Sequence, residues 1–114
     1  MVVEPLGEVR NTSFWSSTRK RSSVENAFEH WKKHQKEFPE LNNAKEYVES
    51  AKGFLNSNSK NILTKRRNNG EIIKYDPEKN LFGVTDKNGT PITFFKPDPS
   101  VHKYPSNLEY FYGQ

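Results

Sequence analysis

Hydrophobic residues recur at helical spacing between Ser22 and Phe38. Ser22 and Glu25 have the spacing of a capping box, in which each side chain accepts a hydrogen bond from a free backbone donor at the helix start. Pro39 ends the segment, because it has no backbone N–H and disfavours helix before it. The apolar positions of this predicted helix fall on one face, which we expect to be buried: Val24, Ala27, Phe28, Trp31 and Phe38.

A second helix is predicted after this one. Asn43 is a suitable N-cap, with Glu46 three residues further on, and a polar loop over 56–60 follows the helix. Its apolar stripe contains six residues: Ala44, Tyr47, Val48, Ala51, Phe54 and Leu55.

From Ile62 onward the pattern changes to short strands separated by turns rich in Asn, Gly and Pro. The predicted strands cover Ile62–Thr64, Glu71–Tyr75, Leu81–Thr85 and Pro91–Phe95. Turns of this type join neighbouring antiparallel strands, because Asn and Gly tolerate a positive φ. Two helices followed by four strands predict an α+β fold, with the N-terminal helices packed on a four-stranded or larger antiparallel sheet. After Pro97 we expect a short helix or a strap on the core.

The first 21 residues show neither helical nor strand periodicity of hydrophobic positions, and they end in a run of basic residues. We expect residues 1–21 to form an extended N-terminal arm, pinned by Phe14 and Trp15, although a linker remnant explains the same pattern. Residues 22–114 then form one folded domain, in keeping with a chain of 114 residues.

Composition narrows the classes of site that this chain can build. Hydrophobic residues make up only 32% of the chain but aromatic residues 13%, so we expect a small aromatic core. The absence of cysteine excludes disulfides, zinc–thiolate sites and thiol nucleophiles. A formal net charge of +4 suits a polyanionic partner without requiring one. No segment resembles a signal peptide, and no apolar run approaches the length of a membrane span.

The first helix carries the main candidate chemistry. His30 and His34 are i,i+4 neighbours, and Lys33 lies three residues after His30. Phosphodiester transesterification needs groups that titrate near neutrality, beside a cation that stabilises the charged phosphorane. The alternative is that both histidines merely edge the core.

A zinc site is a weaker interpretation of the same two histidines. The spacing is that of helical zinc ligands, but the glutamate that follows the first histidine in metalloproteases is Trp31 here. Lys32 and Lys33 would also repel a dication. We therefore expect neither a metal nor a cofactor.

A basic cluster precedes the first strand turn. Lys65 and Arg67 are expected on one face of a strand and Thr64 and Arg66 on the other. Such a cluster can bind phosphates, while exposed aromatic rings stack on bases. The candidate rings for stacking are those of Tyr75, Phe94 and Phe95. The alternative is a solvated hairpin tip.

The chain resembles the colicin D-like tRNase domains at the C-termini of contact-dependent growth inhibition toxins and other polymorphic bacterial toxins. The resemblance covers roughly residues 22–97. It is carried by an ordered series of short motifs: Val24–Pro39, Ala44–Phe54, Leu63–Arg66, Gly70–Pro77, Phe82–Val84 and Gly89–Pro97.

This resemblance implies a barnase/EndoU/colicin/RelE-like fold and metal-independent cleavage of tRNA near the anticodon, through a 2′,3′-cyclic phosphate. It also implies roles for single residues. His34 would be the main general acid/base, with Lys33 as its electrostatic partner. Thr93 would bond the phosphate, and Phe95 would support the base or the pocket. The histidine at position 30 departs from the family motif, where a lysine is expected.

The resemblance further implies a dedicated and usually acidic immunity protein as partner. It implies delivery as the C-terminus of a larger secreted or cell-surface toxin, with action in the cytoplasm of the target cell. Two alternatives remain open at this stage. One is a non-catalytic RNA- or protein-binding module that uses the same basic face, and the other is a related toxin that acts on single-stranded DNA.

Overall fold

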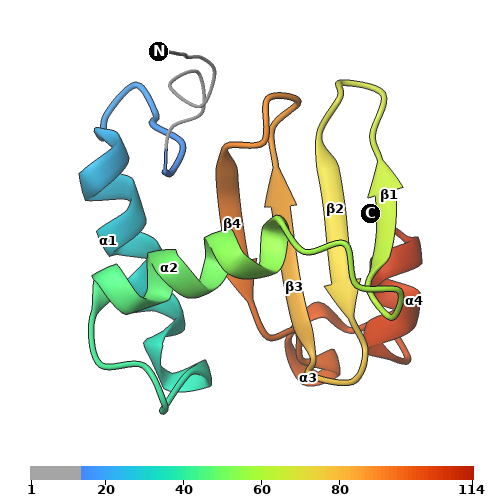
Figure 1. Ribbon diagram of the computed structural model, residues 1–114. Coiled ribbons are helices and arrows are strands. Elements are labelled where there is room, and N and C mark those ends of the chain that lie inside the picture. The colour runs from blue at the N-terminus through green and yellow to red at the C-terminus, as the bar shows by residue number, and fades with distance from the viewer. Residues whose placement is uncertain (1–13) are drawn as a thin grey trace.

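The computed structural model describes residues 14–114, which form an α+β fold (Figure 1). Two helices come first, followed by a four-stranded antiparallel sheet, as the sequence predicted; the tail, predicted as a short helix or a strap, forms two short helices. The helices are α1 (Ser23–His34), the 3-10 helix η2 (Gln35–Glu37), α2 (Ala44–Leu55), α3 (Pro99–His102) and α4 (Asn107–Tyr112). The strands are β1 (Leu63–Arg66), β2 (Ile72–Asp76), β3 (Leu81–Thr85) and β4 (Pro91–Phe95).

The sheet has the strand order β1-β2-β3-β4, so each strand pairs with its neighbours in the chain. Tight turns with a positive φ at Gly70 and Gly89 join two of the three hairpins. In one cross-strand row, Tyr75 pairs with Phe82 and Phe82 with Phe95. In the next row, Val84 pairs with Thr93. Cross-strand partners share a face, so Phe95 and Thr93 lie on the same side of the sheet.

The helices divide between the two faces and one edge of the sheet. In Figure 1, α2 crosses the front face, α3 and α4 lie behind the strands, and α1 stands beside β4. At Gly83 a Cβ atom would approach Leu55 Cδ2 to 2.7 Å, so a glycine lets α2 sit close on β3. Strand β4 is the edge strand next to α1. The C-terminal end of α1 contacts this strand, since the ring of His34 stacks on that of Phe95.

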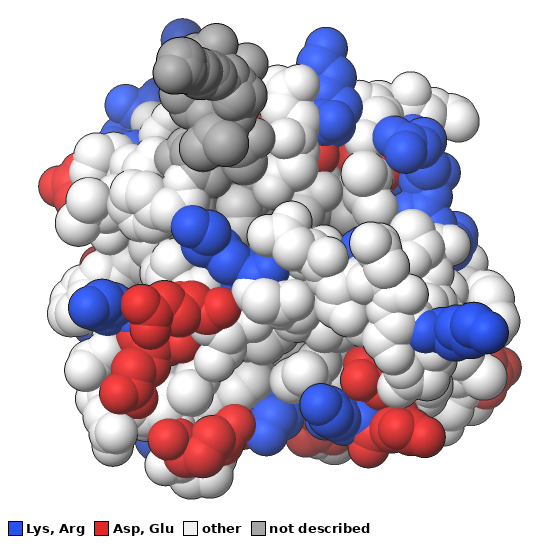
Figure 2. All heavy atoms as spheres, in the orientation of Figure 1, with Lys and Arg blue, Asp and Glu red and all other residues white. Residues whose placement is uncertain are grey.

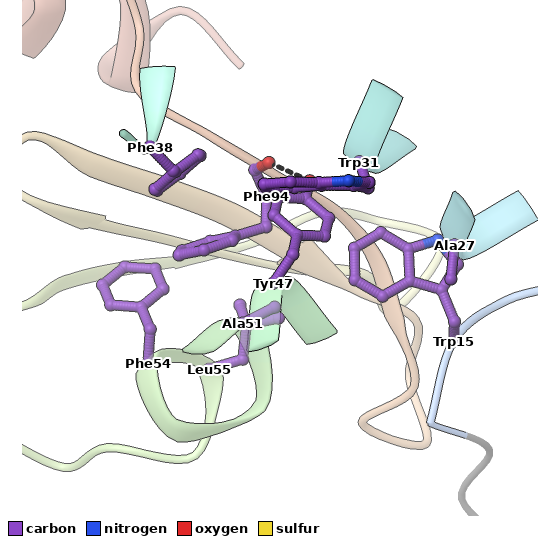
Figure 3. Close-up of a cluster of buried hydrophobic side chains, with 9 residues drawn as sticks. All are labelled: Trp15, Ala27, Trp31, Phe38, Tyr47, Ala51, Phe54, Leu55 and Phe94. Atoms are coloured by element: carbon purple, nitrogen blue, oxygen red, sulfur yellow. Dashed lines mark hydrogen bonds between the residues drawn. The ribbon is translucent and has the colours of Figure 1, made fainter. Parts of the chain in front are cut away.

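The main core is aromatic and is centred on Tyr47 of α2 (Figure 3). The Tyr47 hydroxyl donates a hydrogen bond to the carbonyl of Phe94, which satisfies the one polar atom of a fully buried ring. Trp15, Trp31, Phe38 and Phe94 all lie within 6 Å of the Tyr47 ring, centroid to centroid. A second cluster, on the opposite face of the sheet, packs Phe111 of α4 against Tyr75.

The predicted buried face of the first helix is confirmed only in part, because Ala27, Trp31 and Phe38 are buried but the other two positions are not. Val24 and Phe28 are 67% and 48% exposed, whereas Asn26 and His34 are buried. The reason is tertiary, since the segment before the helix packs on its polar side. Trp15 is fully buried there, and Asn26 Nδ2 donates to the carbonyl of Ser16 at 3.0 Å. A hydrogen-bonded amide can be buried at little cost in free energy, so Asn26 takes a place on the buried face of α1.

The predicted capping box is present, with Glu25 N–H donating to Ser22 Oγ and Ser22 N–H to Glu25 Oε1. The helix predicted to run to Phe38 instead tightens to 3-10 geometry after His34. Of the predicted arm, residues 14–21 are described. Trp15 joins the core, and Ser16 N–H donates to the carbonyl of Pro91. Residues 1–13 lie outside the described part of the chain.

Candidate functional site

A cleft of about 790 Å³ lies between the end of α1, strand β4 and the C-terminal helices. Phe95 lines it, together with polar side chains from three separate parts of the chain. The α1–η2 segment contributes Lys33, His34 and Glu37. Strand β4 and the residues after it contribute Thr93, Phe95, Lys96 and Pro97. The β2–β3 turn and the C-terminal helices contribute Asn80, Asp98, Pro99, Val101, His102, Asn107 and Tyr110.

His34 is held in place by Glu37. Its Nδ1 lies 2.8 Å from Glu37 Oε2, and its ring stacks on Phe95 with a centroid separation of 5.4 Å. The 3-10 turn explains this pairing, because residues i and i+3 eclipse each other in that helix. The other Glu37 oxygen, Oε1, accepts the backbone N–H of Lys96 at 2.8 Å, which ties the pair to β4.

The second ring nitrogen of His34, Nε2, differs from the first in its contacts. Within residues 14–114, no hydrogen bond engages Nε2, while Nδ1 is bound to a carboxylate. A carboxylate on one nitrogen fixes the tautomer and the orientation of an imidazole, and it stabilises the imidazolium when the other nitrogen takes a proton. An imidazole in this arrangement can accept a proton at Nε2 and return it.

His30 lies elsewhere. Its ring packs 5.4 Å from that of Trp15 and 6.1 Å from that of His34, and it is not part of the cleft wall. Its Nδ1 is buried without a hydrogen bond in the described structure. Burial, with smaller contributions from the charges of His34 and Lys33, lowers the pKa of His30 to about 4. His30 is thus neutral at pH 7, and the structure places it with the core.

Two lysines supply positive charge at the cleft. Lys33 is an exposed side chain on its wall, as the sequence suggested. Lys96 was not predicted, and its Nζ lies 5.0 Å from the Phe38 ring centroid and 3.9 Å from Glu40 Oε2. Asp98 adds a negative charge, because hydrogen bonds from Ser100, the backbone N–H foremost, lower the pKa of its carboxyl.

The C-terminal wall is held by a hydrogen-bond network that begins at Asn80. Asn80 Oδ1 accepts from the Tyr75 hydroxyl and from Asn107 Nδ2, both at 3.1 Å, and Asn80 Nδ2 donates to the carbonyl of Pro97. His102 joins this network, since its Nε2 lies 2.8 Å from Asn107 Oδ1. The ring of His102 stacks on Tyr110 with a centroid separation of 4.3 Å.

Of the predicted catalytic residues, the structure therefore brings His34, Lys33 and Thr93 to one cleft, together with Phe95. It does not bring the basic strand there. Lys65 Nζ binds the carbonyls of Tyr112 and Gln114, and Arg67 pairs with Glu71 at 2.7 Å. Arg66 is exposed on β1, at the opposite edge of the sheet from β4. None of these three side chains lines the cleft.

Tyr75 was expected to stack on a base, but its ring is 4% exposed and packs against Phe82 and Phe111. Phe94 is also buried, within the main core. Both rings face helices that cover the sheet, which strand alternation alone does not reveal. Phe95 is the only one of the three candidate rings that lines the cleft.

Glu37, Asn80, His102 and Tyr110 were missed by the sequence reasoning. Glu37 had a usable signal, because an acid three residues after His34 shares its side of a helix. The other three had none, since their place at the cleft depends on how the tail folds back. Figure 2 shows no continuous basic patch on the α2 face, where Lys and Arg side chains are interspersed with acidic ones.

No helix among the described residues is long and apolar enough to cross a membrane. Within the same part of the chain, no group of three or more His, Asp or Glu residues is placed to hold a metal ion. In comparisons with known proteins, the sequence matches no family model and is not significantly similar to any curated protein.

Proposed function

We propose that this protein is an endoribonuclease that cleaves by attack of the ribose 2′-hydroxyl on the adjacent phosphate. One observation carries the proposal: a carboxylate-oriented histidine whose second nitrogen is unengaged in the described structure stands on a cleft with a lysine and a threonine. Each of these groups matches a requirement of transesterification, and none of the steps below calls on a metal ion.

In the proposed reaction, His34 Nε2 takes the proton of the 2′-hydroxyl, and the resulting oxygen attacks phosphorus. Lys33 stabilises the negative charge that builds on the non-bridging oxygens, and the Thr93 hydroxyl donates a hydrogen bond to one of them. The bond between phosphorus and the 5′-oxygen breaks. The products are a 2′,3′-cyclic phosphate and a free 5′-hydroxyl. Phe95 supports a base on the floor of the cleft.

The family resemblance supports a more specific version of this proposal. It favours tRNA cleaved near the anticodon as substrate, growth inhibition of neighbouring bacteria as the outcome, and an acidic immunity protein as partner. Delivery as the C-terminal part of a larger toxin belongs to the same proposal. The net charge of +4 suits both the RNA and an acidic inhibitor.

The test is cleavage of total tRNA by the purified protein in EDTA, with product ends identified as cyclic phosphates. We expect His34→Ala to lower the cleavage rate roughly 10²–10⁴-fold, the usual contribution of a general acid/base. Glu37→Gln keeps an oxygen for the Lys96 N–H but loses the charge beside the imidazole, and we expect a loss of about 10–100-fold. Lys36→Ala is the matched control, since Lys36 is exposed on the same turn and does not line the cleft.

Three results would count against the proposal. Cleavage of an all-deoxy substrate would show that the 2′-hydroxyl is not the nucleophile. Complete loss of cleavage in EDTA would show dependence on a metal ion. RNA binding without any cyclic-phosphate product, unchanged in His34→Ala, would favour the alternative of a non-catalytic binding module.

A further inference from the structure

The proposed reaction leaves one proton unassigned. When the bond between phosphorus and the 5′-oxygen breaks, an alkoxide forms, and it needs a proton from a group other than the one that has just activated the 2′-hydroxyl. Apart from His34, the cleft holds four side chains that can donate one: Lys33, Lys96, His102 and Tyr110. The inference below rests on the proposed function and deepens it by naming this donor.

Two of the four are committed to other contacts. His102 uses both ring nitrogens, because Nε2 binds Asn107 Oδ1 and Nδ1 accepts the backbone N–H of Tyr104 at 3.1 Å. It cannot give up its proton without breaking the bond to Asn107. Lys96 directs its Nζ to the Phe38 ring and toward Glu40. Neither group is free to approach a leaving oxygen.

The ring of Tyr110 is held in place, whereas its hydroxyl is not engaged by other groups of the described structure. Its ring is held by those of His102 at 4.3 Å, Phe82 at 5.1 Å and Tyr104 at 5.5 Å, centroid to centroid. Within residues 14–114, no hydrogen bond engages its hydroxyl, although the residue lines the cleft. Burial raises the pKa of Tyr110, and the charge of Arg67 only partly opposes this effect. The phenol is therefore protonated at neutral pH.

The position of Tyr110 complements that of His34. Both rings contact Phe95: that of His34 stacks on it at 5.4 Å, and that of Tyr110 meets it edge-on at 6.3 Å. The two groups thus reach the same aromatic residue from separate elements, α1 and α4. In-line displacement needs a base at the entering oxygen and a different group as acid at the leaving oxygen, and two groups on separate elements beside one aromatic residue suit this requirement.

We propose that Tyr110 is the general acid of the cleavage reaction. As the bond between phosphorus and the 5′-oxygen breaks, its electron pair stays on that oxygen, which takes the proton of the Tyr110 hydroxyl. The tyrosinate is then reprotonated by water, and His34 returns the proton of the 2′-hydroxyl to solvent. His102 is a positioning residue that holds the Tyr110 ring.

The experiment compares two RNA substrates that differ only in the leaving atom. One has the natural bridging 5′-oxygen, and the other has a bridging 5′-sulfur, which departs as a thiolate and needs no proton. We expect Tyr110→Phe to slow cleavage of the oxygen substrate roughly 10²–10³-fold, mainly in kcat, and to leave the sulfur substrate within about threefold of wild type. His34→Ala slows both substrates, because the 2′-hydroxyl must be activated in either case.

The outcomes separate the two proposals. If the wild-type protein cleaves neither substrate, the proposed function fails. If it cleaves both and Tyr110→Phe slows them equally, Tyr110 acts by packing or binding and the assignment is overturned. Selective rescue by sulfur in Lys33→Ala rather than in Tyr110→Phe would make Lys33 the acid. A native-like thermal transition for Tyr110→Phe, which keeps the ring stack, shows that the comparison is made on folded protein.

Discussion

Two histidines one helical turn apart have different chemistry in this protein. His34 meets a carboxylate and lines the cleft, whereas His30 packs against Trp15 with a buried, unbonded Nδ1. A buried imidazole disfavours its charged form, while a carboxylate neighbour favours it. The sequence presents the two residues as equivalent, and their surroundings separate them.

His30 makes the stability of the fold pH-dependent. Its pKa is about 4 when folded, against an ordinary value of 6.5, so the unfolded chain binds more protons between these pH values. The free energy of unfolding therefore falls as the pH drops from about 6.5 toward 4, and this contribution is fully present above pH 6.5. For a partly buried ring we expect a loss on the order of 1–2 kcal/mol.

Urea unfolding at a series of pH values checks this expectation. His30→Leu removes the titrating group and should reduce the pH dependence over that window by the same amount. His102→Gln is the control, because its ring lies outside the main core. If the wild-type protein and His30→Leu respond equally to acid, the assignment of the effect to His30 is wrong.

At the scale of elements, several basic side chains stabilise the fold through hydrogen bonds to backbone carbonyls. Lys74 of β2 donates to the carbonyls of Leu55 at 2.9 Å and Ser57 at 3.0 Å. These carbonyls lie at the C-terminal end of α2, where backbone acceptors lack helical partners and the helix dipole favours a cation. Lys65 does the same for the end of α4.

Replacing Lys74 with Met tests this structural role. The substitution keeps the aliphatic stem and removes two charge-assisted hydrogen bonds, so we expect the free energy of unfolding to fall by about 1–3 kcal/mol. Lys79→Met, at an exposed turn position with no side-chain contact of this kind, should change it by less than about 0.5 kcal/mol. Equal effects in both variants would mean that the Lys74 bonds contribute nothing to the docking of α2.

At the scale of the whole molecule, the cleft is completed by a segment that carries almost no local signal. Residues from Pro97 onward supply half of its lining residues, and Asn80 ties them to the sheet by binding Tyr75, Pro97 and Asn107. Asn80 has a φ of 56°, which few residues other than Gly and Asn adopt. One turn residue thus helps to hold the wall that carries Tyr110, together with the ring contacts of Tyr110.

Asn80→Gly preserves the backbone conformation and deletes the side-chain bonds. We expect it to loosen the C-terminal segment, so that trypsin cuts after the exposed Lys103 roughly tenfold faster, in line with a loss of 1–2 kcal/mol of local stability. RNA cleavage should fall along with it. Asn68→Gly, in the exposed β1–β2 turn, is the matched control. Unchanged proteolysis in Asn80→Gly would show that the aromatic stacks alone hold the segment.

The fold was largely predictable because its signals are local. The capping box at Ser22, the cap at Asn43 and the turns at Gly70 and Gly89 each depend on a few adjacent residues. They set where the helices and strands begin and end, and the tight turns fix the antiparallel order of the strands. The face that α1 buries was not predictable in this way, because it depends on where Trp15 packs.

The sequence by itself determined the first two helices, the four strands, the α+β class and the candidacy of His34, Lys33, Thr93 and Phe95. Only the tertiary structure decided that these four share a cleft, that Tyr75 and the Nδ1 atom of His30 are buried, and that Glu37 and Tyr110 join the site. The physical reason is the separation along the chain over which each kind of interaction acts. Helix caps and turns act over a few residues, whereas the burial of a ring and the walls of a cleft depend on segments far apart in the chain, such as those joined by the hydrogen bond from Ser16 N–H to the Pro91 carbonyl.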